Sequence, residues 1–250
     1  MALRVRLYER TMFPPLFPAI SYQADAFTFE HHRQPAFSIL PQVFLVYSIF
    51  IKLDGPSRVE INCGEKRIRR RLTCGDLTII PYRFSLEGAS VEASEFLEVC
   101  LQPSIVDRAG HELGLGNHVK LVPVLGVVDP LAEETFYQLE EEVTTGLRRS
   151  NYMNLLVDTL ARHLVRYYAA GTWTRNNVGG FPDYLLNGIL AYIDNSRDQN
   201  LSPEEIADAH GIESDRFARA FRSARSQSIH RYLSERAERL NSRSQQENEQ

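Results

Sequence analysis

Apolar positions in the first hundred residues follow the short period that is typical of β-strands. Between residues 21 and 103, β-branched and aromatic runs such as VFLVYSIF (43–50) and FLEVCL (96–101) are separated by turn signals. The segment 58–72 predicts a hairpin that turns at Cys63-Gly64-Glu65. No helical pattern interrupts these strands, so we predict an antiparallel sandwich or barrel.

After residue 104 the apolar spacing changes to that of helices. Pro130 suits the first position of one helix, and a second helix is expected from residue 150 or 151 onward. Its apolar stripe, with four-residue spacing, contains Leu156, Leu160 and Leu164. The stripe predicts packing against the β-domain, and we expect His163 within it to be a hydrogen-bonded packing residue rather than a ligand.

A break in the pattern separates two predicted domains. Residues 171–181 lack apolar periodicity and are rich in Gly, Asn and Thr, which is typical of a linker. We therefore predict a first domain over residues 1–170 and a helical domain over residues 182–241. Residues 242–250 are polar, and we expect a disordered tail there.

The stretch 201–221, LSPEEIADAHGIESDRFARAF, indicates two short helices joined by a tight turn. Ser202 and Glu205 form a capping box at the start of the first helix. Gly211 stops that helix because glycine readily adopts the left-handed conformation. The second helix is expected from about residue 213 to 225, with Phe217 in the core. This arrangement indicates a helix-turn-helix, although other helical hairpins share a glycine turn and solvated arginines.

Composition adds limits on location and chemistry. The formal net charge of the 250 residues is −4, which does not by itself indicate nucleic-acid binding. Residues 211–243 nevertheless hold eight Arg against four Asp and Glu. The three cysteines lack CxxC spacing, which argues against a disulfide framework or structural zinc. The charged first 20 residues do not resemble a signal peptide, and no apolar run suits a membrane helix, so we expect a cytoplasmic location.

A basic run lies on the expected hairpin at residues 66–71. Five of its six residues are Lys or Arg. The run has two interpretations, a phosphate-binding patch or the solvated face of a strand that protects a sheet edge from pairing. We favour the second.

Residues 185–233 resemble the first helix-turn-helix of AraC-type transcriptional regulators. The matching positions are Tyr192-Ile193, Leu201-Ser202, Glu205-Ile206-Ala207, Gly211, Phe217, Arg219, Phe221 and Tyr232-Leu233. GDLTIIP (75–81) is a second match, to a strand in the cupin-like sensor domain of these regulators. The resemblance implies an α+β fold. It consists of an N-terminal cupin-like antiparallel β-barrel with a following helix pair, then a C-terminal all-α helix-turn-helix domain.

The resemblance also implies which positions contact double-stranded DNA. Early exposed positions of the second helix read bases in the family, and here they are Asp215, Ala218 and Arg219. Arg219 suits bidentate contact with guanine. We expect Arg216, Arg222 and Arg225 to contact phosphates, which give affinity without sequence information. A solvated helix face is the alternative for these arginines.

The implied sensor domain has two expected roles. It binds a small-molecule effector inside the barrel, or it only supports dimerisation. The helix pair is implied to form a homodimer interface through Leu156, Leu160 and Leu164, which competes with the packing interpretation given above.

A metal cofactor is not expected. Cupin enzymes bind metal through an HxH pair, a following glutamate and a distant histidine, and this chain has no HxH. His31 and His32 follow Glu30, but adjacent residues of a strand point to opposite faces and chelate one ion poorly. We therefore expect no catalytic residue and no metal ligand.

The sequence departs from the family pattern at several positions. Glu213 stands where a Ser or Thr usually caps the second helix, with Ser214 as an alternative cap, and Ser226 and Ile229 replace the usual glycine and proline. The second helix-turn-helix of the family is not recognised. We therefore keep two interpretations: a homodimeric, effector-responsive regulator, and a truncated family member without specific DNA binding that sequesters an effector or a partner.

Overall fold

The computed structural model describes residues 12–13, 18–63, 66–170, 180–196 and 201–248. The chain divides into two compact units, residues 1–173 and 174–250. Residues 171–179, which make up most of the predicted linker, lie outside the described residues. Among the described residues, no helix combines the length and the apolar character that crossing a membrane requires.

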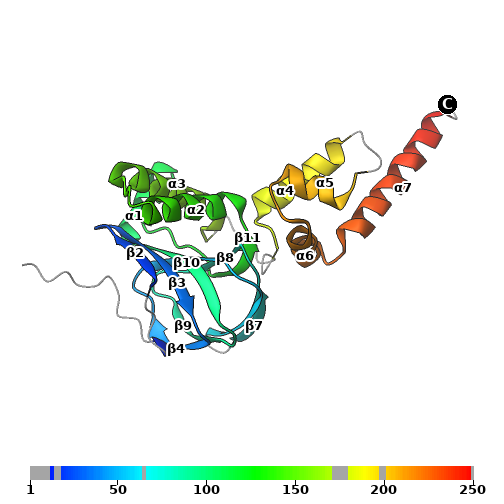
Figure 1. Cartoon of the computed structure of the whole chain (residues 1–250). Coiled ribbons are helices and arrows are strands. Elements are labelled where there is room, and N and C mark those ends of the chain that lie inside the picture. The colour runs from blue at the N-terminus through cyan, green and yellow to red at the C-terminus, as the bar shows by residue number, and fades with distance from the viewer. Residues whose placement is uncertain (1–11, 14–17, 64–65, 171–179, 197–200, 249–250) are drawn as a thin grey trace, which may run out of the picture. The chain divides into compact units, whose positions relative to one another are not determined.

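Two antiparallel sheets build the first unit (Figure 1). The five-stranded sheet has the order β1 (Met12–Phe13), β4 (Phe37–Val43), β9 (Ser85–Ser90), β6 (Ser57–Cys63) and β7 (Lys66–Leu72). The six-stranded sheet has the order β11 (Val124–Val128), β8 (Asp76–Ile80), β5 (Tyr47–Lys52), β10 (Ser94–Leu101), β3 (Phe27–Gln34) and β2 (Ile20–Gln23). The predicted hairpin is confirmed, because β6 and β7 pair in register from Ser57 opposite Leu72 to Cys63 opposite Lys66.

Alternation along the six-stranded sheet separates its two faces. Residues such as Phe29, Ile49 and Leu97 point to the outer face and are fully buried beneath helices. These helices are α1 (Pro103–Glu112), α2 (Pro130–Thr144) and α3 (Ser150–Tyr168), which lie together on one side of the barrel in Figure 1. The inner face lines a cavity between the two sheets.

The basic run lies on an edge strand. β7 ends the order of the five-stranded sheet, and Arg67, Arg69 and Arg71 are exposed. Arg67 and Arg69 form ion pairs with Glu60 of the neighbouring strand. The interpretation as a solvated strand face is confirmed for these three residues, whereas Arg70 points inward and is half-buried. The side chain of Lys66 lies outside the described part of the chain.

The second unit is helical. It contains α4 (Asp183–Asn195), α5 (Pro203–Ala209), α6 (Ser214–Arg225) and α7 (Ile229–Asn248). Its core is a chain of aromatic contacts, with ring-centroid separations of 5.6 Å for Phe181–Phe217, 5.9 Å for Phe217–Phe221 and 5.5 Å for Phe221–Tyr232. The predicted α+β fold class is therefore confirmed, with an antiparallel β-barrel and helix pair followed by helices alone.

Helix α7 extends into the segment that the sequence predicts as a tail. Residues 242–250 are predicted to be disordered, and the described residues among them lie in α7, which ends at Asn248. The segment contains no Pro or Gly, and its Ser, Arg, Gln and Glu residues tolerate a helix that has already been nucleated upstream. Polar composition alone therefore did not end the helix.

Candidate DNA interface and barrel cavity

The turn between α5 and α6 is a Schellman motif. α5 begins at a capping box, in which Ser202 Oγ accepts from the Glu205 N–H at 3.1 Å and the Glu205 carboxylate accepts from the Ser202 N–H at 2.8 Å. At its end the Gly211 N–H bonds to the Asp208 carbonyl and the Ile212 N–H bonds to the Ala207 carbonyl. Gly211 has a φ of 64°, as the sequence predicted.

Glu213 caps α6 directly. Its carboxylate accepts hydrogen bonds from the backbone N–H groups of Asp215 and Arg216, each at 2.9 Å. These bonds hold the pKa of Glu213 below its ordinary value, because they stabilise the charged form more than burial opposes it. The alternative cap at Ser214 is therefore wrong, and Ser214 is the first residue of the helix. The cap therefore places the negative charge of the Glu213 carboxylate at the start of α6.

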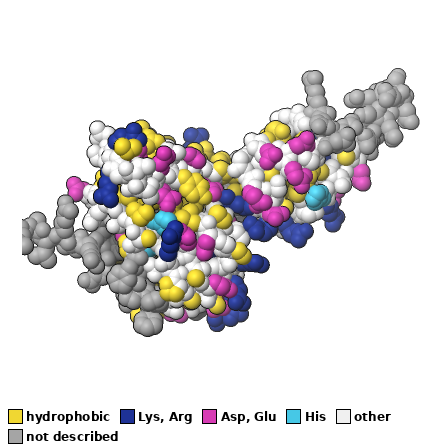
Figure 2. All heavy atoms as spheres, in the orientation of Figure 1, with side chains coloured by type: hydrophobic (Ala, Val, Ile, Leu, Met, Phe, Trp, Pro, Cys, Tyr) yellow, Lys and Arg dark blue, Asp and Glu magenta, His cyan; other side chains and the backbone are white. Residues whose placement is uncertain are grey.

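The face of α6 opposite the core carries most of the predicted DNA contacts. Phe217 and Phe221 are fully buried, as expected, and fix which side of the helix faces inward. At 3.6 residues per turn, the opposite arc contains the half-buried Ala218 and four exposed residues: Asp215, Arg219, Arg222 and Arg225. Figure 2 shows Lys and Arg side chains gathered along one margin of this unit.

Arg216 does not belong to that exposed arc. It is 9% exposed and lies beside Ala220 at the edge of the apolar face. We correct its expected role as a phosphate contact, because a buried guanidinium does not reach the backbone of a duplex laid on the opposite face. The three-residue spacing of Arg216, Arg219 and Arg222 suggested a shared face, but three residues turn the helix by less than a full turn.

Ser226 keeps the turn after α6 in the conformation that glycine usually supplies. Its φ of 55° and ψ of 19° are those of the left-handed region, in which only a few per cent of non-glycine residues occur. A serine therefore forms this left-handed turn. The turn places a strained residue between α6 and α7.

The three residues predicted to form a dimer interface differ in how far they are buried within one chain. Leu160 and Leu164 are fully buried in the core of the barrel unit, and Leu156 is half-buried. We therefore correct the expectation that Leu160 and Leu164 form an interface, since they pack within one chain. On the same helix, Leu155 is 61% exposed. The apolar stripe in the sequence did not show which side of α3 packs on the barrel unit and which side is exposed.

His163 is a hydrogen-bonded packing residue, as the sequence predicted. Its Nε2 lies 2.7 Å from Asp129 Oδ2, and the same carboxylate accepts from the Tyr168 hydroxyl and the Ala132 N–H. Burial alone would raise the pKa of Asp129, but these donors hold it below its ordinary value. Asp129 thereby joins β11, α2 and α3.

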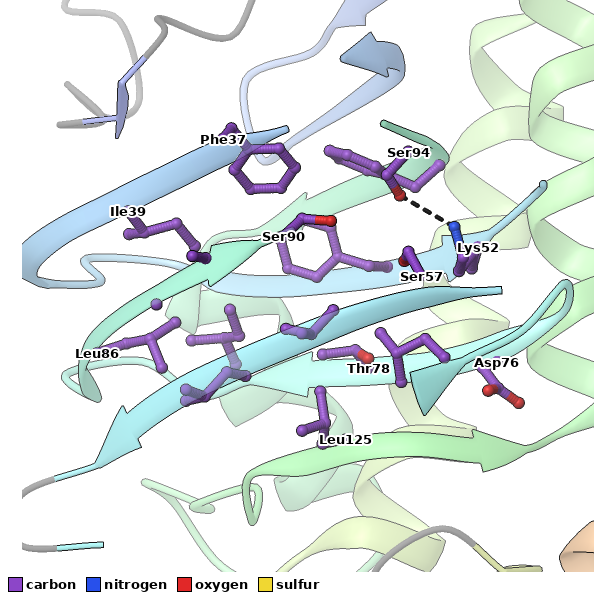
Figure 3. Close-up of a pocket in the computed structure, with 18 of the residues that line it drawn as sticks. Phe37, Ile39, Lys52, Ser57, Asp76, Thr78, Leu86, Ser90, Ser94 and Leu125 are labelled. Carbon is purple, nitrogen blue, oxygen red and sulfur yellow. Dashed lines mark hydrogen bonds between the residues drawn. The ribbon is translucent and has the colours of Figure 1, made fainter. Parts of the chain in front are cut away.

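A cavity of about 100 Å³ lies inside the barrel (Figure 3). Its apolar lining comes from both sheets and includes Phe37, Ile39, Leu86 and Leu125. By the same measure a single water needs about 10–15 Å³, so the cavity has room for several water-sized groups. The predicted barrel interior is therefore partly open rather than filled.

Polar side chains gather at one end of this cavity (Figure 3). The Lys52 ammonium is 3% exposed; it pairs with Asp54 and lies 3.1 Å from Ser94 Oγ. Among the described residues, neither Ser57 Oγ nor Thr78 Oγ1 has a hydrogen-bond partner, although both atoms are buried. Buried hydroxyls without a partner are costly, so this end is suited to a ligand with polar atoms.

Sequence reasoning missed this polar group. Its members lie on four different strands: Lys52 on β5, Ser57 on β6, Thr78 on β8 and Ser94 on β10. Alternation predicts the shared inner face once the strand pairing is known. It does not give the pairing, which depends on contacts far apart in the chain.

His31 and His32 point to opposite faces of β3, as predicted. His31 lies on the helix side, with its ring nitrogens 2.7 Å from Glu95 Oε1 and 2.8 Å from Glu140 Oε1. His32 lies on the inner side, where its Nε2 is 2.9 Å from Glu30 Oε2 and 3.4 Å from Glu98 Oε2. The pair does not chelate one ion, but His32 has carboxylates around it.

Comparison with solved structures finds likeness in arrangement at low sequence identity. CuxR, described as an AraC-like transcriptional activator, is 16% identical with a TM-score of 0.43, over 89% of this chain and 78% of that chain. A cupin superfamily protein from Desulfitobacterium hafniense is 12% identical with a TM-score of 0.29, over 35% and 78%. A cupin-2 domain protein from Shewanella frigidimarina is 14% identical with a TM-score of 0.29, over 34% and 80%. No family model and no curated protein matches the chain.

Proposed function

We propose that this protein is a DNA-binding transcriptional regulator of the AraC type, which acts as a homodimer and responds to a small-molecule effector. The proposed role is binding, without a catalytic residue. The observation that carries it is the helix-turn-helix of α5 and α6, whose exposed arc presents Arg219, Arg222 and Arg225. The choice of the AraC type rests on the sequence resemblance over residues 185–233.

The geometry of α6 supports contact with the major groove. A recognition helix lays its N-terminal half in the groove, while neighbouring groups hold phosphates. Arg219 lies in the first half of α6 and suits bidentate contact with a guanine. Arg222 and Arg225 follow on the same side and suit phosphates. Asp215 suits a cytosine amino group and disfavours phosphates nearby.

A homodimer is proposed because the one helix-turn-helix among the described residues covers little DNA. A single module of this size buries roughly 600–1,000 Å², which is small for specific binding. Two copies joined through the barrel unit would double the interface and read two half-sites. We place the contact on the outer face of α3, where Leu155 is exposed and Leu156 half-buried.

The barrel cavity is the proposed effector site. Its apolar part suits a hydrocarbon or ring, and the Lys52 end suits a polar or anionic group. The hydroxyls of Ser57 and Thr78 would complete their hydrogen bonding with such a ligand. The effector class proposed is therefore a small amphipathic molecule.

Selection from a random duplex-DNA pool tests the DNA-binding proposal. The purified protein is incubated with the pool at low and moderate salt, and the retained DNA is sequenced. We expect enrichment of a sequence with two spaced half-sites, whose spacing reports the geometry of the dimer. Weak retention that disappears with salt and enriches no sequence would show only counterion-driven contact, and would favour the sequestering family member instead.

A further inference from the structure

We propose that the barrel holds a divalent transition-metal ion, bound by Glu30, His32 and Glu98. Their ligand atoms all lie within 4.8 Å of one another. The site lies beside the cavity described above and is separate from its Lys52 end. It goes beyond the proposed function, because metal binding to the barrel does not depend on DNA contact.

The pairing of two strands assembles the site. Glu30 and His32 are two residues apart on β3, so both point to the inner face. Glu98 on β10 stands directly opposite Glu30, and Phe96 stands opposite His32. All three ligand residues thus lie on two paired strands and none lies on a loop. The sheet therefore holds their backbone in place.

The distances suit a metal at the centre of the group. A zinc ion bound at about 2.0–2.1 Å in tetrahedral geometry separates its ligand atoms by about 3.3 Å. His32 Nε2 lies 2.9 Å from Glu30 Oε2 and 3.4 Å from Glu98 Oε2, close to that separation. A divalent cation at this point would interact with both carboxylates and with the imidazole nitrogen.

Burial makes a cation favourable here. Glu98 is 0% exposed and His32 is 1% exposed, and the His32 imidazole lies within 3.4 Å of two carboxylates. Buried charges are normally paired or bound to metal, and a 2+ ion offsets the charge of both carboxylates. Glu30 is partly exposed and gives the ion a route from solvent.

The neighbours of the three ligands fix their orientation. The Cys100 thiol lies 3.0 Å from Glu98 Oε1 and donates to it. The ring of Phe96 stacks on His32 with centroids 4.9 Å apart. Supporting contacts of this kind orient metal ligands in known sites. One imidazole with two carboxylates suits zinc, cobalt or a similar first-row ion better than calcium, which prefers oxygen ligands alone.

The test is titration of the full chain, freed of metal by a chelator, with zinc chloride and separately with cobalt chloride. We expect one equivalent bound per chain, a rise in Tm with zinc, and visible cobalt absorption of a tetrahedral or five-coordinate ion. Glu98→Gln and Glu30→Gln should each weaken zinc binding by at least about tenfold. Glu30→Gln is the variant at the partly exposed position and keeps the test valid if Glu98→Gln fails to fold.

Two matched controls separate this site from adventitious binding. His31→Gln changes the same residue type on the same strand but on the opposite face, and Cys74→Ser removes an exposed thiol elsewhere. Both should bind zinc like the unaltered chain. The proposal is overturned if the unaltered chain binds no zinc equivalent or shows no change in Tm. It is also overturned if the two Glu→Gln variants retain full affinity, in which case the cluster is only hydrogen-bonded.

Discussion

At the scale of single residues, Arg219 is the side chain on which sequence discrimination is predicted to depend. Arg219→Ala should lower affinity for a selected site by about 1–3 kcal/mol and relax the preference for one base pair. The fold should persist, because Arg219 is exposed on α6. Fluorescence anisotropy with the selected duplex and single-base variants measures both effects.

Arg222→Ala provides the matched control for Arg219. A phosphate contact gives affinity without sequence information, so its loss should weaken binding to all duplexes alike and reduce the salt dependence by about one counterion. If Arg219→Ala also weakened all duplexes alike, Arg219 would be a phosphate contact and its assigned role in base readout would be wrong.

Glu213 combines a stabilising cap with a negative charge that would oppose the proposed DNA contact. A Glu carboxylate is ionised near neutral pH at its ordinary pKa, and the helix N–H groups lower the pKa of Glu213 further, so a negative charge lies close to the proposed path of phosphates. Glu213→Thr keeps an oxygen for the helix N–H groups and removes the charge, so duplex affinity should rise at low salt with little change in stability. Glu213→Ala should lose about 1 kcal/mol of unfolding free energy. Equal affinity of the Thr variant and the unaltered chain at low salt would contradict this account.

At the scale of elements, Asp129 connects a strand end with two helices. It follows β11, caps α2 and accepts from His163 and Tyr168 on α3. Since its folded-state pKa is lowered, its stabilisation is present above the ordinary Asp pKa of about 4 and is lost as pH falls through the lower folded-state value. Asp129→Asn should lose about 3 kcal/mol at pH 7, because the amide keeps only one of the two acceptor oxygens and removes the charge that the buried donors surround.

Urea unfolding between pH 7 and pH 3 measures this contribution. The unaltered chain should lose stability as the pH falls, and Asp129→Asn should lose less over the same range. Asp25→Asn, at an exposed position of the same unit, is the control and should follow the unaltered chain. Parallel pH profiles for the unaltered chain and Asp129→Asn would show that Asp129 does not supply the pH dependence.

The sequence predicted elements better where the signals are local. The capping box at Ser202, the left-handed Gly211 and the buried Phe217 follow from residues within one or two turns, and all are confirmed. The β6–β7 hairpin is also local. The inward position of Arg216 was missed, because tertiary packing overrides residue type there.

The residues of the candidate sites were also predicted better where the sequence signal is local. The exposed arc of α6 was predicted, apart from Arg216, since a helix carries its own periodicity. The polar end of the cavity, with Lys52 and Thr78, was not predicted, because those residues meet through strand pairing. The Glu30-x-His32 spacing was visible as a same-face pair on a strand. Its partner Glu98 was not, since 66 positions separate it from His32 in the sequence.

At the scale of the whole molecule, the helix face around Leu155 is predicted to determine the oligomeric state. Leu155→Glu should convert a dimer to a monomer with little change in unfolding free energy, because the side chain is already 61% exposed in one chain. Light scattering measures the mass. A dimer that persists in this variant would place the interface elsewhere.

Leu160→Glu is the contrasting variant on the same helix. Leu160 is fully buried, so a charge there should destabilise the barrel unit by about 3 kcal/mol or more rather than separate two folded copies. Urea unfolding monitored by far-UV circular dichroism measures the loss of unfolding free energy. A folded, equally stable monomer would show that Leu160 faces a partner after all.

Strand β3 has one face toward the inside of the barrel and the other toward the helices. Its inner side places His32 beside Glu30 and Glu98, and its outer side places His31 beside Glu140 on α2. Neighbouring residues of one strand share a peptide unit, so a displacement of one side chain's backbone displaces the other. A metal ion that displaced the backbone at His32 would therefore also displace His31 and its contact with Glu140 on α2.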